Sequence, residues 1–421
     1  MKINVRNLPL EQALAMPAPT AKRPKRPWWL FRTLVRILSV PDLIATKFKY
    51  EKIGMEKAGK GPFLILMNHS SFIDLKIASK VLYPKPYYIV STADALVGKE
   101  WLMRKIGCMP TPKFTPDVTL ARNIARALHE QKTSVLLFPE AGYSFDGCTT
   151  TLPRKLGGLL KQLNVTVLSL ITNGAFLRQP LYNNLRLRKV QTSAKLTCLA
   201  TKDEIAEKSV EELDTIIDNA FAFDNFRSQA ENGVQVTEPN RAEGLHRVLY
   251  KCPHCQAENQ MQGENATLRC LACGKEYFMD ELGQLSATDG ETEFTHIPSW
   301  YNWQRECVKQ ELLNGTYRLE TDVNLIMLCG YKCLYQIGEG KLTHDENGFT
   351  LTDPNGKLIH QQAPLFSYSV NADYNWYEIG DVVSIGDKKR QFYCIPKSNV
   401  SVTKVRFAAE ELYKILKSKL K

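Results

Sequence analysis

The stretch LILMNHSSFIDL, residues 64–75, combines a strand pattern with two side chains that can do chemistry. Its apolar run ends abruptly at Asn68-His69, and Asp74 follows five residues after the histidine. The pattern predicts a buried strand, a short turn, and a helix that begins near Ser71. His69 then lies in the turn and Asp74 in the first helical turn, where an imidazole and a carboxylate can meet.

Short apolar runs alternate with helical patterns across residues 50–228. Continuous apolar strands that alternate with helices are typical of a sheet covered on both faces. The predicted fold class is therefore α/β, with a mostly parallel sheet flanked by helices. Functional side chains of such sheets gather at the carboxyl ends of strands, where His69 and Glu140 both fall. The predicted strands are 63–67, 87–91, 134–138, 165–171 and 194–200, and the predicted helices are 71–82, 119–131, 154–163 and 210–226.

The His69–Asp74 pair also has a purely structural interpretation. This spacing recurs by chance, and a lone histidine at a strand end more often serves structure than catalysis. Ser71 can be the N-cap of the helix, with Asp74 at its third position in a capping-box arrangement. In the functional interpretation, Asp74 accepts a hydrogen bond from one imidazole nitrogen and leaves the other free as a general base.

A second stretch, VLLFPEAGYSFDG at residues 135–147, again leaves a carboxylate at the end of a strand pattern. The motifs N-H-x-x-x-x-D, at 68–74, and F-P-E-A-G-Y-S, at 138–144, resemble two motifs of the glycerolipid acyltransferase family. That family acylates lysophosphatidate and related lysophospholipids, and its motifs read N-H-x-x-x-x-D and F-P-E-G-T-R-S in this order. The resemblance covers about residues 28–228, roughly half of the chain.

The resemblance implies an O-acyltransferase that moves a fatty acyl group from acyl-CoA or acyl-carrier protein to a lysophospholipid such as 1-acylglycerol-3-phosphate. It implies His69 as the general base, Asp74 as the residue that orients it, and Glu140 as a residue that positions the glycerol moiety. No covalent acyl-enzyme is implied, so none of the 11 cysteines is needed as a nucleophile. The further substrate-binding positions that it implies are Asn68, Lys113, Ala141, Gly142, Tyr143 and Ser144.

Two departures from the family motifs concern the lipid acceptor. Tyr143 stands where the family has arginine, and Ala141 stands where it has glycine. The best match to the family's second motif, G-x-x-F-I-x-R, is residues 107–113, which end in Lys113. Lysine is a point charge and tyrosine a neutral donor, so bidentate capture of a phosphate is weakened. The acceptor stays open among lysophosphatidate, a lysophospholipid with a substituted phosphate, a glycolipid and another lipid alcohol.

Residues 1–49 form a basic N-terminal segment of a 421-residue chain whose net charge is +11. Trp28 and Trp29 precede a helical pattern with an apolar stripe, so residues 27–48 are predicted to bind a membrane surface. The alternative is that the stripe packs on the protein's own core. No apolar stretch predicts a transmembrane helix or a signal peptide, so we expect a cytoplasmic protein, peripheral on the inner face of the membrane. The basic residues are Lys22, Arg23, Lys25, Arg26, Arg32 and Arg36, and the stripe is Leu30, Phe31, Leu34, Val35 and Leu38.

Two CxxC pairs, Cys252/Cys255 and Cys270/Cys273, are separated by fourteen residues. This spacing predicts a tetrahedral zinc site with four cysteine ligands. A redox dithiol and a nucleic-acid-binding ribbon are alternatives, and a structural zinc clip for a segment without its own core is preferred. Residues 256–268 carry two acidic side chains and no basic one, so no nucleic-acid partner is expected.

The rest of the domain plan follows from changes in composition. The polar residues 229–247 are predicted to be a linker, and residues 248–289 a zinc ribbon. Hairpin signals and alternating runs in residues 290–421 predict a β-sandwich or open barrel that ends in a helix. Three rivals to acyl transfer remain: a non-catalytic lipid-binding or scaffold protein, a zinc-ribbon nucleic-acid-binding protein, and a hydrolase that transfers the acyl group to water.

Overall fold

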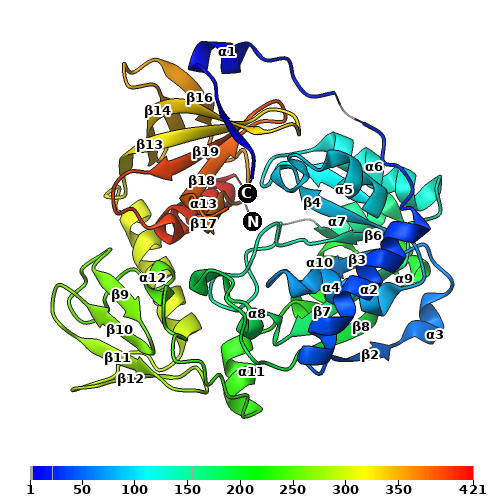
Figure 1. Ribbon diagram of the computed structural model, residues 1–421, viewed down its shortest axis with the longest axis horizontal. Coiled ribbons are helices and arrows are strands. Elements are labelled where there is room, and N and C mark those ends of the chain that lie inside the picture. The colour runs from blue at the N-terminus through cyan, green and yellow to red at the C-terminus, as the bar shows by residue number, and fades with distance from the viewer. Residues whose placement is uncertain (1–2, 21, 154–155, 421) are drawn as a thin grey trace.

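The computed structural model describes residues 3–20, 22–153 and 156–420, which form three β-sheets (Figure 1). A seven-stranded sheet and its helices form the right-hand body in Figure 1, and an eight-stranded and a four-stranded sheet lie on the left. Helix α12 (Ile297–Leu313) joins the two left-hand sheets along the chain and packs against the C-terminal helix α13 (Val402–Lys419). Within these described residues, no helix is long and apolar enough to cross a bilayer.

The seven-stranded sheet has the order β2-β8-β7-β3-β6-β4-β5, and only its β7/β8 pair is antiparallel. The predicted α/β class with a mostly parallel sheet is therefore confirmed. The sequence did not predict β2 and β5, because both are short edge strands without a buried apolar run. The strands are β2 (Lys49–Ile53), β3 (Leu64–Met67), β4 (Tyr87–Thr92), β5 (Cys108–Thr111), β6 (Ser134–Leu137), β7 (Val167–Asn173) and β8 (Ser193–Ala200).

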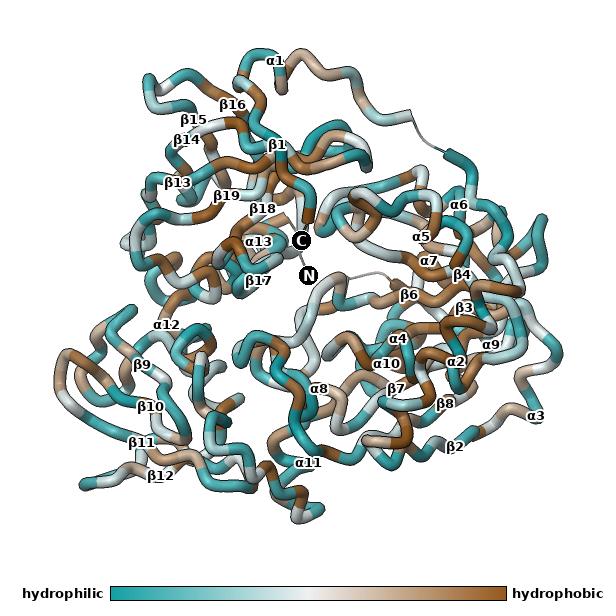
Figure 2. Tube along the Cα trace, viewed as in Figure 1, coloured by the Kyte–Doolittle hydropathy of each residue, from teal (hydrophilic) through white to brown (hydrophobic). Residues whose placement is uncertain are grey.

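Successive side chains of β3 enter two hydrophobic cores, one on each face of this sheet. Ile65 and Met67 pack on the side of α2 and α4, and Leu64 and Leu66 pack on the side of α6, α7 and α10. Because both faces are covered, β3 is apolar throughout, as its hydrophobic trace in Figure 2 shows. The helices are α2 (Trp29–Ala45), α3 (Met55–Ala58), α4 (Ile73–Leu82), α5 (Glu100–Ile106), α6 (Val118–His129), α7 (Leu156–Leu163), α8 (Ala175–Arg178), α9 (Lys202–Glu207), α10 (Val210–Ala220) and α11 (Asn225–Glu231).

The predicted helix over 210–226 is in fact two helices, α10 and α11. Phe221 is the C-cap of α10 and is buried. Asp224 then caps a new helix, because its side chain accepts the backbone N–H of Arg227 at 2.9 Å. The helical apolar period continues across this break, so periodicity alone did not reveal the new cap.

Residues 229–247 are packed against the protein, although their composition is that of a linker. Val236, Ala242 and Leu245 are buried in the same hydrophobic core as the four-stranded sheet. That sheet has the order β12-β11-β10-β9 and is antiparallel throughout. Its strands are β9 (Met261–Glu264), β10 (Thr267–Cys270), β11 (Glu276–Met279) and β12 (Leu285–Ala287).

The C-terminal region contains one antiparallel sheet, to which β1 adds an eighth strand, and it ends in α13, as predicted. A single sheet corrects the predicted β-sandwich, whereas the alternative of an open barrel stays a prediction. Its main path is β16-β15-β14-β13-β19-β18-β17, and all pairs on this path are antiparallel. Tight turns pair consecutive strands within a single sheet, and β1 adds to β14 in parallel. The elements are β1 (Val5–Asn7), α1 (Leu10–Ala15), β13 (Leu319–Leu328), β14 (Leu334–Asp345), β15 (Gly348–Thr352), β16 (Leu358–Gln362), β17 (Asn371–Trp376), β18 (Gly380–Gly386) and β19 (Gln391–Pro396).

The eight-stranded sheet contacts the seven-stranded body through a small hydrophobic cluster. Ala93 and Val97, which follow β4, pack with Trp376 and Tyr393. Trp376 Nε1 also donates a hydrogen bond to Asp94 Oδ2 at 3.1 Å. The C-terminal sheet therefore lies against the carboxyl edge of the parallel strands, which is the edge where side chains of this fold class do chemistry.

Candidate active site

His69 and Asp74 contact each other at the carboxyl end of β3. His69 Nδ1 lies 3.1 Å from Asp74 Oδ2, and Asp74 is fully buried. The same oxygen accepts the backbone N–H groups of Ser70 at 2.7 Å and Ser71 at 3.0 Å. An ionised carboxylate only accepts hydrogen bonds, so it holds the imidazole proton on Nδ1 and leaves Nε2 as the acceptor nitrogen. The two side chains therefore lie in contact, as the sequence led us to expect.

Only one half of the predicted capping box forms, because Asp74 Oδ2 accepts the Ser71 N–H but Ser71 Oγ does not bond the Asp74 N–H. Phe72 occupies the N-cap of α4 and makes no side-chain cap bond. Ser71 Oγ instead donates to the carbonyl oxygen of Ala175 at 2.9 Å, which ties the turn to the start of α8. Asp74 accepts N–H groups from the turn before the helix, so its carboxylate closes the turn that carries His69.

Two aromatic rings flank the imidazole of His69. Its ring centroid lies 4.1 Å from that of Phe138 and 4.3 Å from that of Tyr143. Phe72 packs edge-to-face on Tyr143 and is itself exposed. The His69 side chain keeps 23% of its surface exposed, so the imidazole is oriented by its neighbours and still open to a substrate.

Asn68 is fully buried and joins the ends of β3 and β7. Its Oδ1 accepts the Thr172 N–H at 2.8 Å and lies 3.1 Å from Thr172 Oγ1, and its Nδ2 donates to the Thr172 carbonyl at 3.1 Å. Thr172 Oγ1 also lies 3.5 Å from Asp74 Oδ1, so these residues form one network under the turn. Because the Asn68 amide is engaged within the protein, its role toward the substrate stays a prediction.

Glu140 is fully buried and holds two loops through its two oxygens. Oε2 accepts the His69 N–H at 2.8 Å, and Oε1 accepts the Thr150 N–H at 2.9 Å. Burial raises the pKa of Glu140 to about 7, against these two bonds and the charge of Arg406. Glu140 therefore fixes the backbone of His69, and a direct contact with a glycerol moiety stays a prediction.

The loop over 141–144 returns to the His69 turn. Ala141 has a φ of +54°, in the left-handed region that disfavours any residue with a Cβ. Gly142 is buried, and no heavy atom would lie within 4 Å of a Cβ there. Ser144 is also buried, and its N–H donates to the His69 carbonyl at 3.1 Å while its Oγ donates to the Cys148 carbonyl at 2.6 Å. This loop therefore stabilises the His69 turn through a backbone hydrogen bond.

Lys113 follows β5 and contacts a carboxylate from the C-terminal sheet. Its Nζ lies 3.9 Å from Asp373 Oδ2 on β17. Burial raises the pKa of Asp373 to about 6, against the charge of Lys113. Burial, and then the charges of Asp74, Asp373 and Asp94, raise the pKa of the Tyr143 hydroxyl well above its ordinary value. The surroundings of Tyr143 are thus acidic, and the charge of Lys113 is compensated.

A buried charge network connects α12 and α13 to the loop that follows Glu140. Glu410 accepts hydrogen bonds from Arg305 at 2.6 Å, from Arg406 at 3.0 Å and from Thr151 Oγ1 at 3.0 Å. Burial opposes the ionisation of Glu410, but the two guanidinium groups overcome it and lower its pKa to about 2. The carboxylate therefore stays charged and holds the loop to the terminal helix.

The sequence analysis did not single out the C-terminal side chains that reach this edge. The Tyr368 hydroxyl donates to the Pro139 carbonyl at 3.5 Å, and Tyr368 also lines a cavity of about 310 Å³ beside Thr150 and Lys414. Such contacts join residues more than 200 positions apart, so no local pattern signals them. Thr172 did have a signal, because it follows a predicted strand and so falls at the same edge.

The four cysteine sulfurs of the two CxxC pairs converge within 4.8 Å of one another. Cys252 and Cys273 are 3.9 Å apart, and Cys255 and Cys270 are 3.7 Å apart. In a tetrahedral site with zinc–sulfur bonds of about 2.3 Å, the sulfurs lie about 3.8 Å from one another. The cluster therefore fits zinc, while His254 points to Glu293 at 3.3 Å and is exposed.

A His–Asp pair on a strand-to-helix turn, with a second buried carboxylate under it, gives this α/β domain a candidate general base. Residues 49–171 match the model of the Acyltransferase family. The 1-acyl-sn-glycerophosphate (LPA) acyltransferase PlsC from Thermotoga maritima is a solved structure that resembles it, with 14% identity and a TM-score of 0.36. The match covers 45% of this chain and 76% of that one. No curated protein sequence matches the chain.

Proposed function

We propose that the protein transfers a fatty acyl group from acyl-CoA or acyl-carrier protein to the hydroxyl of a lysophospholipid or related lipid alcohol. The His69–Asp74 pair carries the proposal, because its 3.1 Å contact lies within the segment that matches the Acyltransferase family. His69 is the general base and acts through Nε2, since Asp74 occupies Nδ1.

The chemistry requires one proton transfer in each direction. His69 Nε2 takes the proton of the acceptor hydroxyl as its oxygen attacks the thioester carbon. The carbon–sulfur bond then breaks, and the imidazolium returns the proton to the leaving thiolate. The new bond is an oxygen ester, and no acyl-enzyme forms. A base positioned in this way contributes about 10²–10⁴-fold in rate.

The other buried groups are positioning residues in this proposal. Asp74 stabilises the imidazolium as it forms, and Glu140 holds the His69 backbone through a 2.8 Å hydrogen bond. Tyr143 and Phe138 restrict the ring to one orientation by packing on it. An imidazole fixed in this way loses little freedom when the substrate binds.

The acceptor class depends on the pair that Lys113 forms with Asp373. An isolated lysine attracts a phosphate monoester, whereas a compensated one does so much less. Together the pair offers a hydrogen-bond donor and an acceptor, which suits hydroxyl groups. 1-Acylglycerol-3-phosphate remains a candidate, and a lysophospholipid with a substituted phosphate or a glycolipid fits the charge at Asp373 better.

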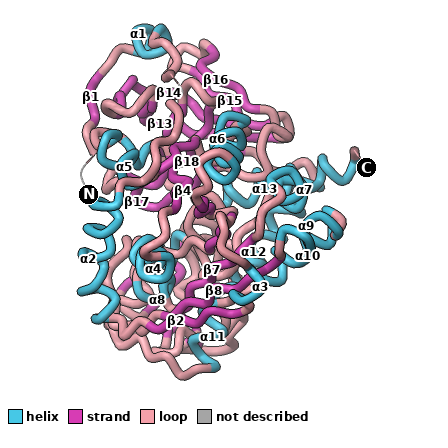
Figure 3. Tube along the Cα trace, turned by 90° about the vertical axis from the view of Figure 1, so that its right-hand side faces the viewer, coloured by secondary structure: helices cyan, strands magenta, loops and turns pink. Residues whose placement is uncertain are grey.

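Helix α2 supports docking on a membrane surface. Figure 3 shows α2 beside α4 on the outside of the molecule. Ser39 and Leu43 of α2 are buried against the protein, so part of the helix does pack on its own core. The remaining face exposes a row of large apolar side chains, as a peripheral protein on the inner face of a membrane requires. These are Leu30, Leu34, Ile37, Leu38 and Ile44, whereas Phe31 and Val35 of the predicted stripe are half-buried.

Zinc is proposed as a structural ion held by Cys252, Cys255, Cys270 and Cys273. When bound, it supplies four strong bonds that fix the two turns of a small sheet. Tyr277 of that sheet packs on Trp300 of α12 with ring centroids 4.9 Å apart. The ribbon thereby supports α12, whose Arg305 belongs to the charge network behind the candidate site.

The test is thiol release from a long-chain acyl-CoA by the purified full-length protein, with a panel of lysophospholipid, monoacylglycerol and glycolipid acceptors in mixed micelles. We expect acceptor-dependent release that His69→Ala abolishes and that His129→Ala, at an exposed histidine on α6, leaves unchanged. Release without any acceptor would instead indicate a hydrolase. Absence of release from both acyl-CoA and acyl-carrier protein would favour a non-catalytic lipid-binding protein.

A further inference from the structure

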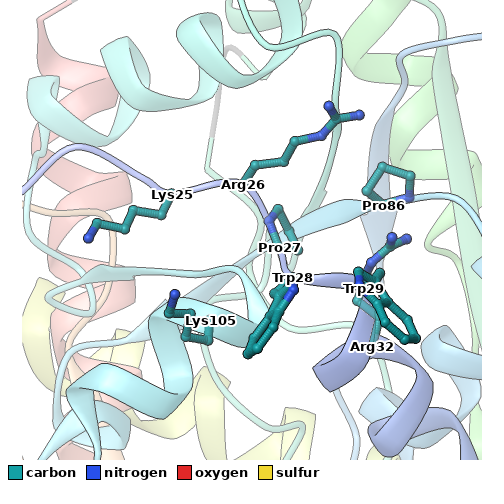
Figure 4. A pocket seen from close by; sticks show the side chains of 8 residues that line it. All are labelled: Lys25, Arg26, Pro27, Trp28, Trp29, Arg32, Pro86 and Lys105. Carbon is teal, nitrogen blue, oxygen red and sulfur yellow. The ribbon is translucent and has the colours of Figure 1, made fainter.

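A basic pocket of about 470 Å³ lies at the start of α2, and the candidate active site does not use it (Figure 4). Four cationic residues line it, from the segment before α2, from α2 itself and from α5. Figure 4 shows Lys105 beside Trp28 and Arg32 beside Trp29. The lining residues used below are Lys25, Arg26, Trp28, Trp29, Arg32 and Lys105.

The cations of this pocket have no carboxylate partner among the residues that the structure describes. The nearby carboxylate of Glu100 is already shared, since it lies 2.8 Å from Lys22 and 2.8 Å from Arg104. Arg32 donates from Nη1 to the Pro84 carbonyl at 2.6 Å, but its buried Nε has no hydrogen-bond partner in the described part of the chain. Burial, and then the charge of Arg26, lower the pKa of Arg32. A buried donor without a protein partner, among like charges, would be satisfied by an anionic ligand.

The pocket is built into the fold. The backbone N–H of Trp28 donates to the Lys105 carbonyl at 3.0 Å, and Lys105 Nζ lies 5.4 Å from the centre of the Trp28 ring. Gly107 has a φ of +109°, and a Cβ there would come within 2.5 Å of Pro27 Cγ. A glycine is therefore required where the N-terminal segment crosses α5. These contacts hold Pro27 and Trp28 against the end of α5, beside Lys105.

The surroundings of the pocket indicate that its anion belongs to a bilayer. Trp29 is 61% exposed and Trp101 is 66% exposed, although both are large apolar rings. The exposed apolar row of α2 begins directly beside them, at Leu30. Tryptophan prefers the headgroup layer, and a lipid phosphate lies at that depth. A soluble anion would gain nothing from this exposed apolar rim.

We propose that this pocket binds the phosphate of an anionic phospholipid in the membrane, with Arg26 and Arg32 as its main ligands. Arginine suits phosphate because it donates two parallel hydrogen bonds, and Lys25 and Lys105 add charge. The bound lipid is a docking ligand and not the acyl acceptor, since Arg32 reaches the Pro84 carbonyl beyond the last turn of α4, whereas His69 lies before the first turn of that helix. The inference rests on the proposed membrane docking and adds that the membrane must contain anionic phospholipids.

The test compares binding of the full-length protein to vesicles of phosphatidylcholine alone and to vesicles that also contain phosphatidylglycerol. Co-sedimentation at physiological ionic strength gives both affinities. We expect Arg26→Gln/Arg32→Gln to weaken binding to the anionic vesicles by about tenfold or more and to leave binding to neutral vesicles unchanged. Trp29→Ala should weaken binding to both, because it removes apolar contact and not charge.

The control removes the same charge elsewhere, as Lys357→Gln/Lys389→Gln, at two exposed lysines of the C-terminal region. An equal loss in this control would show that net charge alone attracts the protein, and would overturn the proposed site. Displacement of the protein from vesicles by inorganic phosphate would assign the pocket to a free anion and overturn the lipid. A second pair, Lys25→Gln/Arg26→Gln, tests the pocket at exposed positions if Arg32→Gln misfolds. Binding is measured without donor or acceptor, so failed acyl transfer leaves this test intact.

Discussion

Asp373 of the C-terminal sheet lies 3.9 Å from Lys113 of the seven-stranded body, across the interface between two parts of the chain. Two further contacts cross at this edge, from Trp376 to Asp94 and from Tyr368 to Pro139. The C-terminal region therefore belongs to the wall of the candidate site. Its attachment to an acyltransferase segment has a physical consequence, because it adds a carboxylate where the acceptor headgroup is proposed to bind.

Asp373→Asn is expected to change which acceptor is preferred. Removal of the carboxylate leaves the charge of Lys113 uncompensated, so lysophosphatidate should gain relative to an uncharged monoacylglycerol by about tenfold in kcat/KM. Rates with both acceptors in the same micelles measure this ratio. Asp322→Asn, at an exposed aspartate of β13, is the matched control and should leave the ratio unchanged. An unchanged ratio in Asp373→Asn would remove Asp373 from the acceptor site.

Two substitutions of Asp74 separate its catalytic role from its structural one. Asparagine can keep an oxygen toward Ser70, Ser71 and His69, so Asp74→Asn should fold normally. It lacks the charge that stabilises the imidazolium, so kcat should fall by about 10²–10⁴-fold. Asp74→Ala should lose kcat equally and also lose about 1–3 kcal/mol of unfolding free energy, because two buried N–H groups lose their acceptor.

Kinetics and thermal unfolding of the two Asp74 variants provide the measurement. Addition of His69→Ala to either variant should lower kcat no further, since both residues act on the same proton. Full activity in Asp74→Asn would show that Asp74 only closes the turn.

Glu140 should make stability fall as pH rises through the neutral range. Its folded pKa of about 7 lies above the ordinary glutamate value of about 4.3. The folded state therefore binds the Glu140 proton more tightly than the unfolded state does. The resulting contribution to the unfolding free energy is fully present below about pH 4 and is lost as pH rises through about 7. Unfolding free energies of the protein and of Glu140→Gln, compared across this range, should diverge by up to about 3 kcal/mol. Parallel curves would contradict a raised pKa.

The core of the site was predictable because its parts are local. The strand at Leu64–Met67, the turn and Asp74 lie within a few residues of one another, and apolar runs mark buried parallel strands clearly. The second carboxylate, Glu140, also follows a strong strand pattern. The carboxyl ends of parallel strands lie at one edge of the sheet, so the proximity of His69 and Glu140 could be predicted without predicting any loop conformation.

Other features depend on contacts that no local pattern encodes. Ser71 has the chemistry of an N-cap, but its hydroxyl finds Ala175, which is 104 residues away. β1 adds to β14 because the N-terminal segment crosses to the other body. Glu140 was expected to contact substrate, and its full burial under the His69 turn is a property of packing. In each case the local sequence allows more than one partner, and contacts with residues distant in the sequence determine which partner is used.

Glu410→Gln should uncouple α13 from the loop behind the site. It leaves the buried Arg406 without its ion-pair partner and leaves Arg305 with Glu411 alone, which costs about 3–5 kcal/mol in unfolding free energy. The folded pKa of about 2 lies below the ordinary value of about 4.3, so this stabilisation is present above about pH 4 and lost as pH falls toward 2. Denaturant unfolding provides the measurement. The control is Glu306→Gln, which removes an exposed ion pair with Lys309 on α12 and should have little effect on the unfolding free energy.

Zinc removal should unfold the ribbon before it affects the acyltransferase segment. A chelator removes the zinc–sulfur bonds, and Cys270→Ser removes one of the four ligands. A sheet this small depends on these bonds, so the protein should lose one zinc ion per chain and strands β9–β12 should unfold at the same time. Metal analysis and hydrogen exchange of these strands measure both. Cys307→Ser, at a half-buried cysteine of α12 outside the cluster, should retain the metal. The cluster has no contact with His69 in the described structure, so acyl transfer at low temperature should survive chelation. Loss of transfer with an intact ribbon would make the ion catalytic and would overturn the structural role.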